Sequence, residues 1–510
     1  MHAGNGGPAG ELLSALLEAG DGPAAAFVTP EDGVTLTYAQ LAGSVEALAR
    51  GLAGAGVRRG DRVALTLPNG PEFVQIILAA TLLGAAAAPL NPAYTESEFA
   101  FYLEDIAPRL LLVPAAGAPR AAVSAAGSAS VPLIELAAGA QPELIADGMA
   151  AGAAASYEPG EPDDIALVLH TSGTTSRPKQ VPLRQRNLMA SARTIARHYQ
   201  LSADDVSFCA MPLFHIHGLV ASAFAAMAAG GAVLAPRRFT AHRFWPQARQ
   251  YGATWLSAGP TLHQMILDRA DADGAPASLR FARSCSSPLT PAVLDRAEAG
   301  YGVPMLEAYG MTEASHQMTS NPLPPAAREP GSVGVPAGAE IATADPAGRL
   351  LGAREPGEVV IRGPGVMSGY LNNPEANEGA FVGDWFRTGD RGAIRDGYLY
   401  LEGRLKEMIL RGGENISPAE IEQALLAHPA VADAVSFGVS DDRYGEVPAA
   451  AVTLSQDVPV SDLTGHCREL LAAFKVPTAI YVLPEIPRTA TGKVQRRRVG
   501  EHIVGTQAAG

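Results

Sequence analysis

The stretch IALVLHTSGTTSRPKQVPL, residues 165–183, decides the fold expected for this chain. Its first five residues form a continuous apolar run with β-branched members, which predicts a buried strand. A loop rich in Gly, Ser, Thr and basic residues follows at once, and its hydroxyl and backbone N–H groups suit an anion. The loop lacks G-x-x-x-x-G-K-[ST], so it is not a Walker loop. A polar turn after a strand is the alternative interpretation.

We interpret this loop as a phosphate cradle, which predicts an enzyme that consumes ATP. The predicted ATP contacts are Thr171, Ser172, Gly173, Thr174, Thr175 and Lys179.

Length and composition predict a globular protein of several units. The chain has 510 residues, and roughly 150 residues per domain suggests about three units. Hydrophobic residues make 47% of the chain and charged residues 18%, which is typical of globular proteins. The formal net charge of −14 argues against a nucleic acid or an anionic membrane as partner.

Cysteines and termini favour a cytoplasmic location. Cys209, Cys285 and Cys467 are scattered and include no C-x-x-C pair, which suits a reducing compartment and argues against structural zinc. We expect no signal peptide and no peroxisomal S-K-L. The most membrane-like run, residues 73–90, contains Gln, Gly and Pro, and a buried helix followed by a strand explains it better than a membrane span.

Alternating patterns predict an α/β fold with layered subdomains. Residues 38–55 are expected to form an amphipathic helix, residues 62–67 a strand and residues 71–83 a helix. Residues 115–155, rich in Ala, Gly, Ser and Pro, suggest a surface excursion. Short strands after residue 357 predict a small β-barrel, and a compact α+β pattern follows. We therefore predict a large N-terminal domain over residues 1–403, whose β-rich subdomain covers about 330–403, and a small domain over 404–510.

The run LEAYGMTE, residues 306–313, predicts a strand that ends at a nucleotide. The ring of Tyr309 can stack on adenine, the Thr312 hydroxyl can reach the α-phosphate, and the Glu313 carboxylate can bind Mg²⁺. An ordinary strand-end turn explains the run equally well when it is taken alone.

Two later runs add charged candidates. In WFRTGD, residues 385–390, Asp390 is expected in a turn after a strand, where its carboxylate can accept both ribose hydroxyls, with Arg404 nearby. In PRTATGKVQR, residues 487–496, Lys493 stands on a flexible stem that can enter an active site. A turn-capping Asp and a solvated basic tail are the alternatives.

Together these runs resemble, in identity and order, the adenylate-forming enzymes, which include acyl-CoA synthetases, peptide adenylation domains and luciferase. The resemblance covers nearly the whole chain. HTSGTTSRPK, PLFHIHGL, RSCSSPL, EAYGMTEASHQMTSNPLP and FKVP look most similar to the oxalyl-CoA synthetases of plants and fungi.

The resemblance implies a ligase that uses ATP, Mg²⁺ and coenzyme A. A carboxylate would attack the α-phosphorus to give an acyl-adenylate, the small C-terminal domain would rotate about Lys406, and the CoA thiol would displace AMP. Lys493 would act in adenylation and Gly413 would leave room for pantetheine. The other implied contacts are His215 beside the carboxylate, Ser286 and Ser287 at adenine, and Tyr444 and Lys475 near the CoA nucleotide.

Two residues depart from the pattern of that family. Gln180 replaces the usual Gly after Lys179, and a positive φ there would cost roughly 1 to 2 kcal/mol. Either the backbone is extended at Gln180 or ATP handling is altered. Gly310 stands where oxalyl-CoA synthetases tend to have Ala, which leaves the acid open.

Polar residues near the predicted substrate favour a small acid such as oxalate. Arg283, Ser284 and His316 offer partners to a second carboxylate, although they can also simply bond one another. Alternatives are transfer of the adenylate to an amine, a medium-chain acyl-CoA synthetase, or a nucleotide-binding protein disabled by Gln180. We expect a small carboxylic acid as partner, and a monomer or homodimer.

Overall fold

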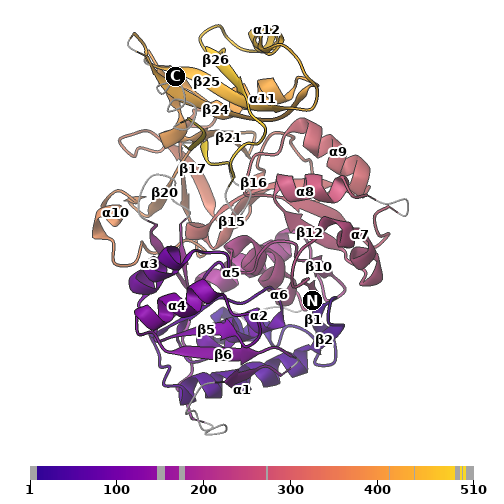
Figure 1. The fold of residues 1–510 in the computed structure, drawn as a ribbon, viewed down its shortest axis with the longest axis vertical. Coiled ribbons are helices and arrows are strands. Elements are labelled where there is room, and N and C mark those ends of the chain that lie inside the picture. The colour runs from indigo at the N-terminus through magenta and orange to yellow at the C-terminus, as the bar shows by residue number, and fades with distance from the viewer. Residues whose placement is uncertain are drawn as a thin grey trace.

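The molecule is a layered α/β structure with a smaller α+β part at its C-terminal end (Figure 1). It is a computed structural model that describes residues 8–139, 141–145, 155–171, 178–270, 274–412, 414–441, 443–488, 494–496 and 498–500. Two large sheets are built from strands within residues 25–336, a β-rich part follows, and the C-terminal elements, yellow in Figure 1, lie at the far end.

A seven-stranded sheet carries the phosphate-loop stems, and its order is β7-β6-β5-β3-β4-β8-β9. The predicted apolar strand is β8 (Ile165–His170), and β9 (Gln180–Arg184) pairs antiparallel with it. The membrane-like run forms α2 (Pro71–Leu82) and then β4 (Ala86–Pro89), both buried, as predicted. The remaining elements are α1 (Tyr38–Gly54), β3 (Arg62–Leu65), α3 (Glu96–Ile106), β5 (Leu110–Pro114), α4 (Arg120–Ser128), β6 (Leu133–Ala137) and β7 (Glu143–Ile145).

A nine-stranded sheet carries the other candidate residues, in the order β16-β15-β14-β13-β12-β10-β11-β1-β2. Its central strands are parallel, so their carboxyl ends meet at one edge, where sites in α/β proteins usually form. The strands are β1 (Ala25–Thr29), β2 (Val34–Thr37), β10 (Val206–Phe208), β11 (Ala232–Leu234), β12 (Trp255–Ala258), β13 (Phe281–Ser284), β14 (Met305–Met311), β15 (His316–Ser320) and β16 (Val335–Pro336).

Helices connect and cover these strands. One of them, η3 (His217–Phe224), is a π-helix and is entirely buried. The others are the 3-10 helices η1 (Pro8–Glu11), η2 (Leu13–Leu16) and η4 (Thr312–Ala314), and the α-helices α5 (Gln185–His198), α6 (Ala225–Ala228), α7 (Ala241–Gln250), α8 (Pro260–Leu267) and α9 (Pro291–Tyr301).

The β-rich part is a five-stranded antiparallel sheet in which β20 pairs with β18, β19 and β21. Its described strand pairs end at β17 on one side, so it is an open sheet where we predicted a barrel. The elements are β17 (Glu340–Ala344), β18 (Gly357–Arg362), α10 (Pro374–Glu378), β19 (Phe381–Val382), β20 (Trp385–Arg395) and β21 (Tyr398–Arg404).

The C-terminal part has its own five-stranded sheet and its own apolar core. Its elements are η5 (Leu405–Glu407), β22 (Ile409–Arg411), β23 (Glu414–Ile416), α11 (Pro418–Leu426), β24 (Val431–Asp441), β25 (Gly445–Leu454), α12 (Val460–Leu470) and β26 (Ala479–Val482).

The predicted α/β class is confirmed, and besides the barrel two further local predictions are wrong. The described part of residues 115–155 contains α4, β6 and β7 rather than a surface excursion, because Ala122, Ala125 and Ala126 bury one face of α4. Residues 140 and 146–154 lie outside the described residues. Asp390 lies inside β20 rather than in a turn, because strands pair with this segment on both sides. The domain boundary at 403–404 stays a prediction. In the part of the chain that the structure describes, no helix is long and apolar enough to span a bilayer.

Candidate active site

The two stems of the predicted phosphate loop are held together by hydrogen bonds. Thr171 N donates to Lys179 O at 2.9 Å, and Lys179 N donates to Thr171 Oγ1 at 3.1 Å. The hairpin therefore closes directly below the loop. Ser172, Gly173, Thr174 and Thr175 lie outside the described residues, so their predicted phosphate contacts stay predictions.

The backbone is extended at Gln180, which is the first of the two alternatives given for this departure from the family pattern. It is the first residue of β9, its side chain is buried, and it pairs with His170 across the hairpin. Its Nε2 donates to Asp105 O at 2.7 Å and to Asp105 Oδ2 at 2.9 Å. His170 Nε2 also lies 2.9 Å from Asp105 Oδ2, so both stems are fastened to α3. A strand position needs no positive φ, so Gln imposes no backbone strain here.

Glu313 and Lys179 both contact Tyr370, Glu313 at its hydroxyl and Lys179 at its ring face. The Tyr370 hydroxyl donates to Glu313 Oε1 at 3.0 Å, and Lys179 Nζ lies 4.5 Å from the centre of the ring. Burial, together with the Glu313 charge, raises the pKa of Tyr370, so the hydroxyl remains a donor. Sequence reasoning missed Tyr370, because a tyrosine in a loop carries no local signal of this role.

The Glu313 carboxylate fits a divalent cation. It is buried, it accepts the Tyr370 hydrogen bond, and no ion pair to it is found among the described residues. The described residues contain no group of three or more His, Cys, Asp or Glu side chains that would hold a metal alone. One carboxylate combined with substrate phosphates is a usual arrangement for Mg²⁺.

Tyr309, Asp390 and Arg404 form a chain of contacts between the nine-stranded and β-rich sheets. The Tyr309 hydroxyl donates to Asp390 Oδ2, and Arg404 Nε lies 3.4 Å from Asp390 Oδ1. Burial and the Asp390 charge raise the pKa of Tyr309 well above its usual value. The structure thus brings three predicted nucleotide residues together. Thr312 follows β14 at the start of η4, next to Glu313.

Arg283 is the centre of a buried polar cluster. It is 0% exposed, and its guanidinium donates to Tyr199 Oη at 2.8 Å, Ser257 Oγ at 2.8 Å and Gln317 Oε1 at 3.1 Å. It also lies 3.3 Å from His217 Nε2 and 3.5 Å from His316 Nδ1. These partners are all neutral groups or imidazoles.

His217 is a site residue that sequence reasoning missed. It is the second histidine of PLFHIHGL, and its ring lies edge-on to His316 with 4.8 Å between ring centres. Its Nδ1 lies 2.9 Å from Ser286 Oγ and its Nε2 2.7 Å from Ser257 Oγ. The histidine pair in that motif was the available signal, since two polar rings in an apolar run need partners.

The predicted His215 lies immediately before η3 and is partly buried. Its ring packs on Phe214 with 4.4 Å between centres, and Leu219 N donates to its backbone oxygen at 3.0 Å. Its placement beside a substrate carboxylate stays a prediction.

The three serines of the SCSSPL turn have different environments. Ser284 is fully buried at the end of β13, and within the described chain its Oγ has no hydrogen-bond partner. Ser286 has a φ of 78°, an uncommon value for a residue other than Gly, and this aims its hydroxyl at His217. Ser287 Oγ donates to Ser286 O at 2.9 Å, which closes the turn.

Gly310 allows His316 to lie where it does. A Cβ on residue 310 would be 2.3 Å from His316 O and 2.7 Å from His316 Nδ1. His316 itself has a φ of 97°. The glycine at this departure from the family pattern is therefore coupled to the position of His316.

Of the predicted CoA residues, Tyr444 lies in the turn between β24 and β25, and Lys475 lies in the connection between α12 and β26. Arg411 and Arg443 lie 4.8 Å and 5.1 Å from the ring centre of Tyr444, and Arg411 donates to Phe474 O. Lys475 Nζ is neutralised by Glu420, at 2.7 Å from both carboxylate oxygens. The exposed ring and two nearby cations fit a nucleotide with phosphates. Gly413 and Lys493 lie outside the described residues.

Comparison with known proteins shows the family of this chain. Residues 18–371 match the family model "AMP-binding enzyme", and residues 420–493 match "AMP-binding enzyme C-terminal domain". The chain is 47% identical to an oxalate–CoA ligase of Arabidopsis thaliana, covering 92% of this chain and 94% of that protein. It is 41% identical to an oxalate–CoA ligase of Saccharomyces cerevisiae, covering 87% of each.

A similar solved structure is ATP-bound MatB from Rhodopseudomonas palustris, with a TM-score of 0.88 and 28% identity, covering 97% of this chain and 98% of that chain. The family matches extend over most of the sequence, and its relatives are CoA ligases. This chain therefore belongs to the AMP-binding enzymes, and within them it is an AMP-forming acid–thiol ligase.

Proposed function

We propose that this enzyme is an oxalate–CoA ligase that works in two steps. In the first, an oxalate oxygen attacks the α-phosphorus of ATP, the bond from that phosphorus to the bridging oxygen breaks, and pyrophosphate leaves. In the second, the CoA sulfur attacks the activated carbonyl carbon and AMP leaves, which gives oxalyl-CoA. Bound Mg²⁺ supplies charge neutralisation at the phosphates.

The observation that carries the choice of acid is the buried Arg283. Its guanidinium is fully buried, yet no acidic side chain pairs with it among the described residues. A buried charge without a counterion costs several kcal/mol, which is tolerated where a ligand supplies the counterion. A dianion carries one carboxylate to react and a second to balance this charge. Oxalate–CoA ligases among the relatives agree with that chemistry.

Arg283 also determines which ring nitrogen carries the proton in two neighbouring histidines. Arginine only donates hydrogen bonds, so His217 Nε2 and His316 Nδ1 are acceptors toward it. In their neutral forms these rings then carry protons on His217 Nδ1 and His316 Nε2. His217 Nδ1 faces Ser286, and we propose that His316 Nε2 donates to the distal carboxylate.

We assign the remaining roles as follows. Glu313 binds the metal ion, Thr312 and Lys179 bind phosphates, and His215 lies at the reacting carboxylate. Electrostatic stabilisation of the charge that develops at the α-phosphate of the transferred adenylyl group is the main catalytic contribution.

We further propose that residues 404–510 move as a unit about Lys406. Lys493 would then serve adenylation, and the loop with Gly413 would serve thioester formation. Two separate half-reactions on one small domain require such an exchange.

The test is pyrophosphate release across a panel of mono- and dicarboxylates from C2 to C8, with and without CoA. Oxalate is expected to give the highest kcat/KM, and oxalyl-CoA should form only when CoA is present. Octanoate exceeding every C2 to C4 acid would overturn the choice of a small acid while leaving the ligase. AMP release that requires an amine rather than CoA would overturn the acceptor.

A further inference from the structure

Tyr370 touches both charged side chains that the proposed function assigns to Mg-ATP. Its hydroxyl donates to Glu313, and its ring face lies below the ammonium of Lys179. A cation is attracted to an aromatic face, and a hydroxyl donor fixes the orientation of a carboxylate. One side chain therefore positions an ammonium and a carboxylate of opposite charge.

The backbone of Tyr370 is held from both sides. Tyr370 N donates to Asn377 Oδ1 at 2.7 Å, and Asn377 Nδ2 donates back to Tyr370 O at 2.8 Å. The next residue, Leu371, donates through its N–H to Gln180 O at 3.0 Å. Tyr370 is thus tied to α10 and to the exit of the phosphate loop.

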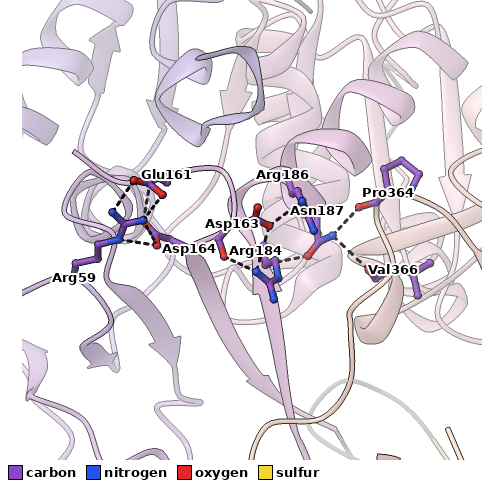
Figure 2. Close-up of polar contacts among 9 residues, drawn as sticks. All are labelled: Arg59, Glu161, Asp163, Asp164, Arg184, Arg186, Asn187, Pro364 and Val366. Carbon is purple, nitrogen blue, oxygen red and sulfur yellow. Dashed lines mark hydrogen bonds and ion pairs between the residues drawn. The ribbon is translucent and has the colours of Figure 1, made fainter. Parts of the chain in front are cut away.

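The loop before Tyr370 is fastened to the element that carries Glu313. Asn187 Nδ2 donates to Pro364 O at 2.7 Å and to Val366 O at 3.4 Å, as Figure 2 shows. Met367 N donates to Glu313 O at 2.8 Å, and Ser315 Oγ donates to Gly365 O at 2.8 Å.

The segment that leads into β8 is fixed by arginines at the end of the β8–β9 hairpin that lies away from the phosphate loop. Figure 2 shows Arg59 bound to Glu161 and Asp164, and Arg184 and Arg186 bound to Asp163. These ion pairs hold the end of the hairpin away from the phosphate loop, and the bond from Leu371 N to Gln180 O holds the phosphate-loop end.

Within the described chain no ion pair joins Lys179 to Glu313, although both touch Tyr370. A direct ion pair between Lys179 and Glu313 would neutralise the ammonium that binds a polyphosphate and the carboxylate that binds its cation. We propose that Tyr370 is a positioning residue that keeps Lys179 and Glu313 separate and oriented for the ATP polyphosphate and its divalent cation. The inference rests on the proposed ATP chemistry of the site and not on the identity of the acid.

The test measures ATP binding by calorimetry without acid or CoA, first in EDTA and then across a Mg²⁺ titration. Tyr370→Phe keeps the ring and removes only the hydroxyl, while Tyr370→Leu removes both contacts. The Phe variant should need roughly tenfold more Mg²⁺ for half-maximal ATP binding and bind metal-free ATP as before, since one hydrogen bond to a charged group is lost. The Leu variant should in addition bind metal-free ATP roughly threefold more weakly.

Tyr398→Phe is the matched control, because its hydroxyl donates to Ala327 O at 2.7 Å in the same β-rich part. It should leave both titrations unchanged. Glu313→Gln should raise the Mg²⁺ requirement as well, and adding Tyr370→Phe to it should change little further.

A Phe variant with an unchanged Mg²⁺ requirement would overturn the role of Tyr370. If the Phe variant bound ATP equally more weakly with and without Mg²⁺, that result would also overturn the role of Tyr370, because it would indicate a general loss of structure. If the unmodified enzyme binds ATP without any effect of Mg²⁺, the assigned chemistry of Glu313 fails instead. If this enzyme prefers an acid other than oxalate, the test of Tyr370 is unaffected, because it is carried out without acid.

Discussion

The side chain of Gln180 on β9 is bound to Asp105 on α3, with Nε2 2.7 Å from the backbone oxygen and 2.9 Å from Oδ2. The residue that departs from the family pattern is therefore a structural fastening between the phosphate-loop hairpin and a helix. Gln180 therefore contributes to the stability of the fold through its hydrogen bonds, and it imposes no backbone strain.

We predict that Gln180→Gly lowers the free energy of unfolding by about 1 to 3 kcal/mol, because the half-buried Asp105 oxygens lose the Gln180 amide donor and a glycine weakens the strand. The KM for ATP should change only slightly, since β9 is extended with either residue. Gln180→Met is the control, because it removes the amide and keeps an ordinary backbone. A rise above about tenfold in kcat/KM, equivalent to about 1.4 kcal/mol, would show that Gln180 restrains the loop.

Lys493→Ala should separate the two half-reactions. Acyl-adenylate formation should fall by about 10² or more, as expected for loss of a charge that stabilises the transition state. Thioester formation from supplied adenylate should survive. Arg498→Ala, which removes a nearby exposed cation bound to Gln495 at 3.0 Å, should affect neither step. Equal loss of both half-reactions would contradict the proposed rotation about Lys406.

His316→Ala should discriminate between acids. Losing a partner of a buried carboxylate typically costs several kcal/mol, so kcat/KM for oxalate should fall far more than for a monocarboxylate of similar size. Steady-state kinetics with both acids measures the ratio. His428→Ala on the C-terminal part is the control and should leave the ratio unchanged. An equal loss for the two acids would mean that His316 only supports the structure.

Glu307 on β14 should make stability depend on pH. Burial raises the pKa of Glu307 to about 7, so the folded protein keeps this proton to a higher pH than the unfolded chain does. The unfolded chain releases it at its usual value of about 4.5, so the free energy of unfolding falls as pH rises from there to about 7. The loss amounts to about 3 kcal/mol at most.

Glu307→Gln should remove this part of the pH dependence. The check compares thermal unfolding midpoints of both proteins at pH 5 and pH 8. The variant should gain stability relative to the unmodified protein at pH 8. Parallel midpoints at the two pH values would show that Glu307 does not titrate in this range.

The sequence by itself determined the local elements near the phosphate loop. The apolar run before the loop became β8, and the amphipathic pattern of residues 38–55 became α1 (Tyr38–Gly54), because strand burial and helix amphipathicity are written in residue periodicity. The ordered motifs also indicated the family, because their identity and order resemble those of the adenylate-forming enzymes.

Predictions from local sequence pattern were wrong where packing against other elements determines the secondary structure. The alanine-rich residues 115–155 show little contrast between faces, and α4 exists because its alanines pack on the seven-stranded sheet. Asp390 follows a glycine with a φ of 73°, which suggests a turn, yet β18 and β21 extend the strand through it.

Only the tertiary structure decided which residues meet. Arg283 comes from β13, His217 from η3, Ser257 from β12 and His316 from β15, and strand order in the sheet brings these separate segments to one buried point. Tyr370 reaches Lys179 and Glu313 in the same way. Such contacts depend on how strands pair and loops fold over them, and side-chain periodicity along one segment does not contain that information.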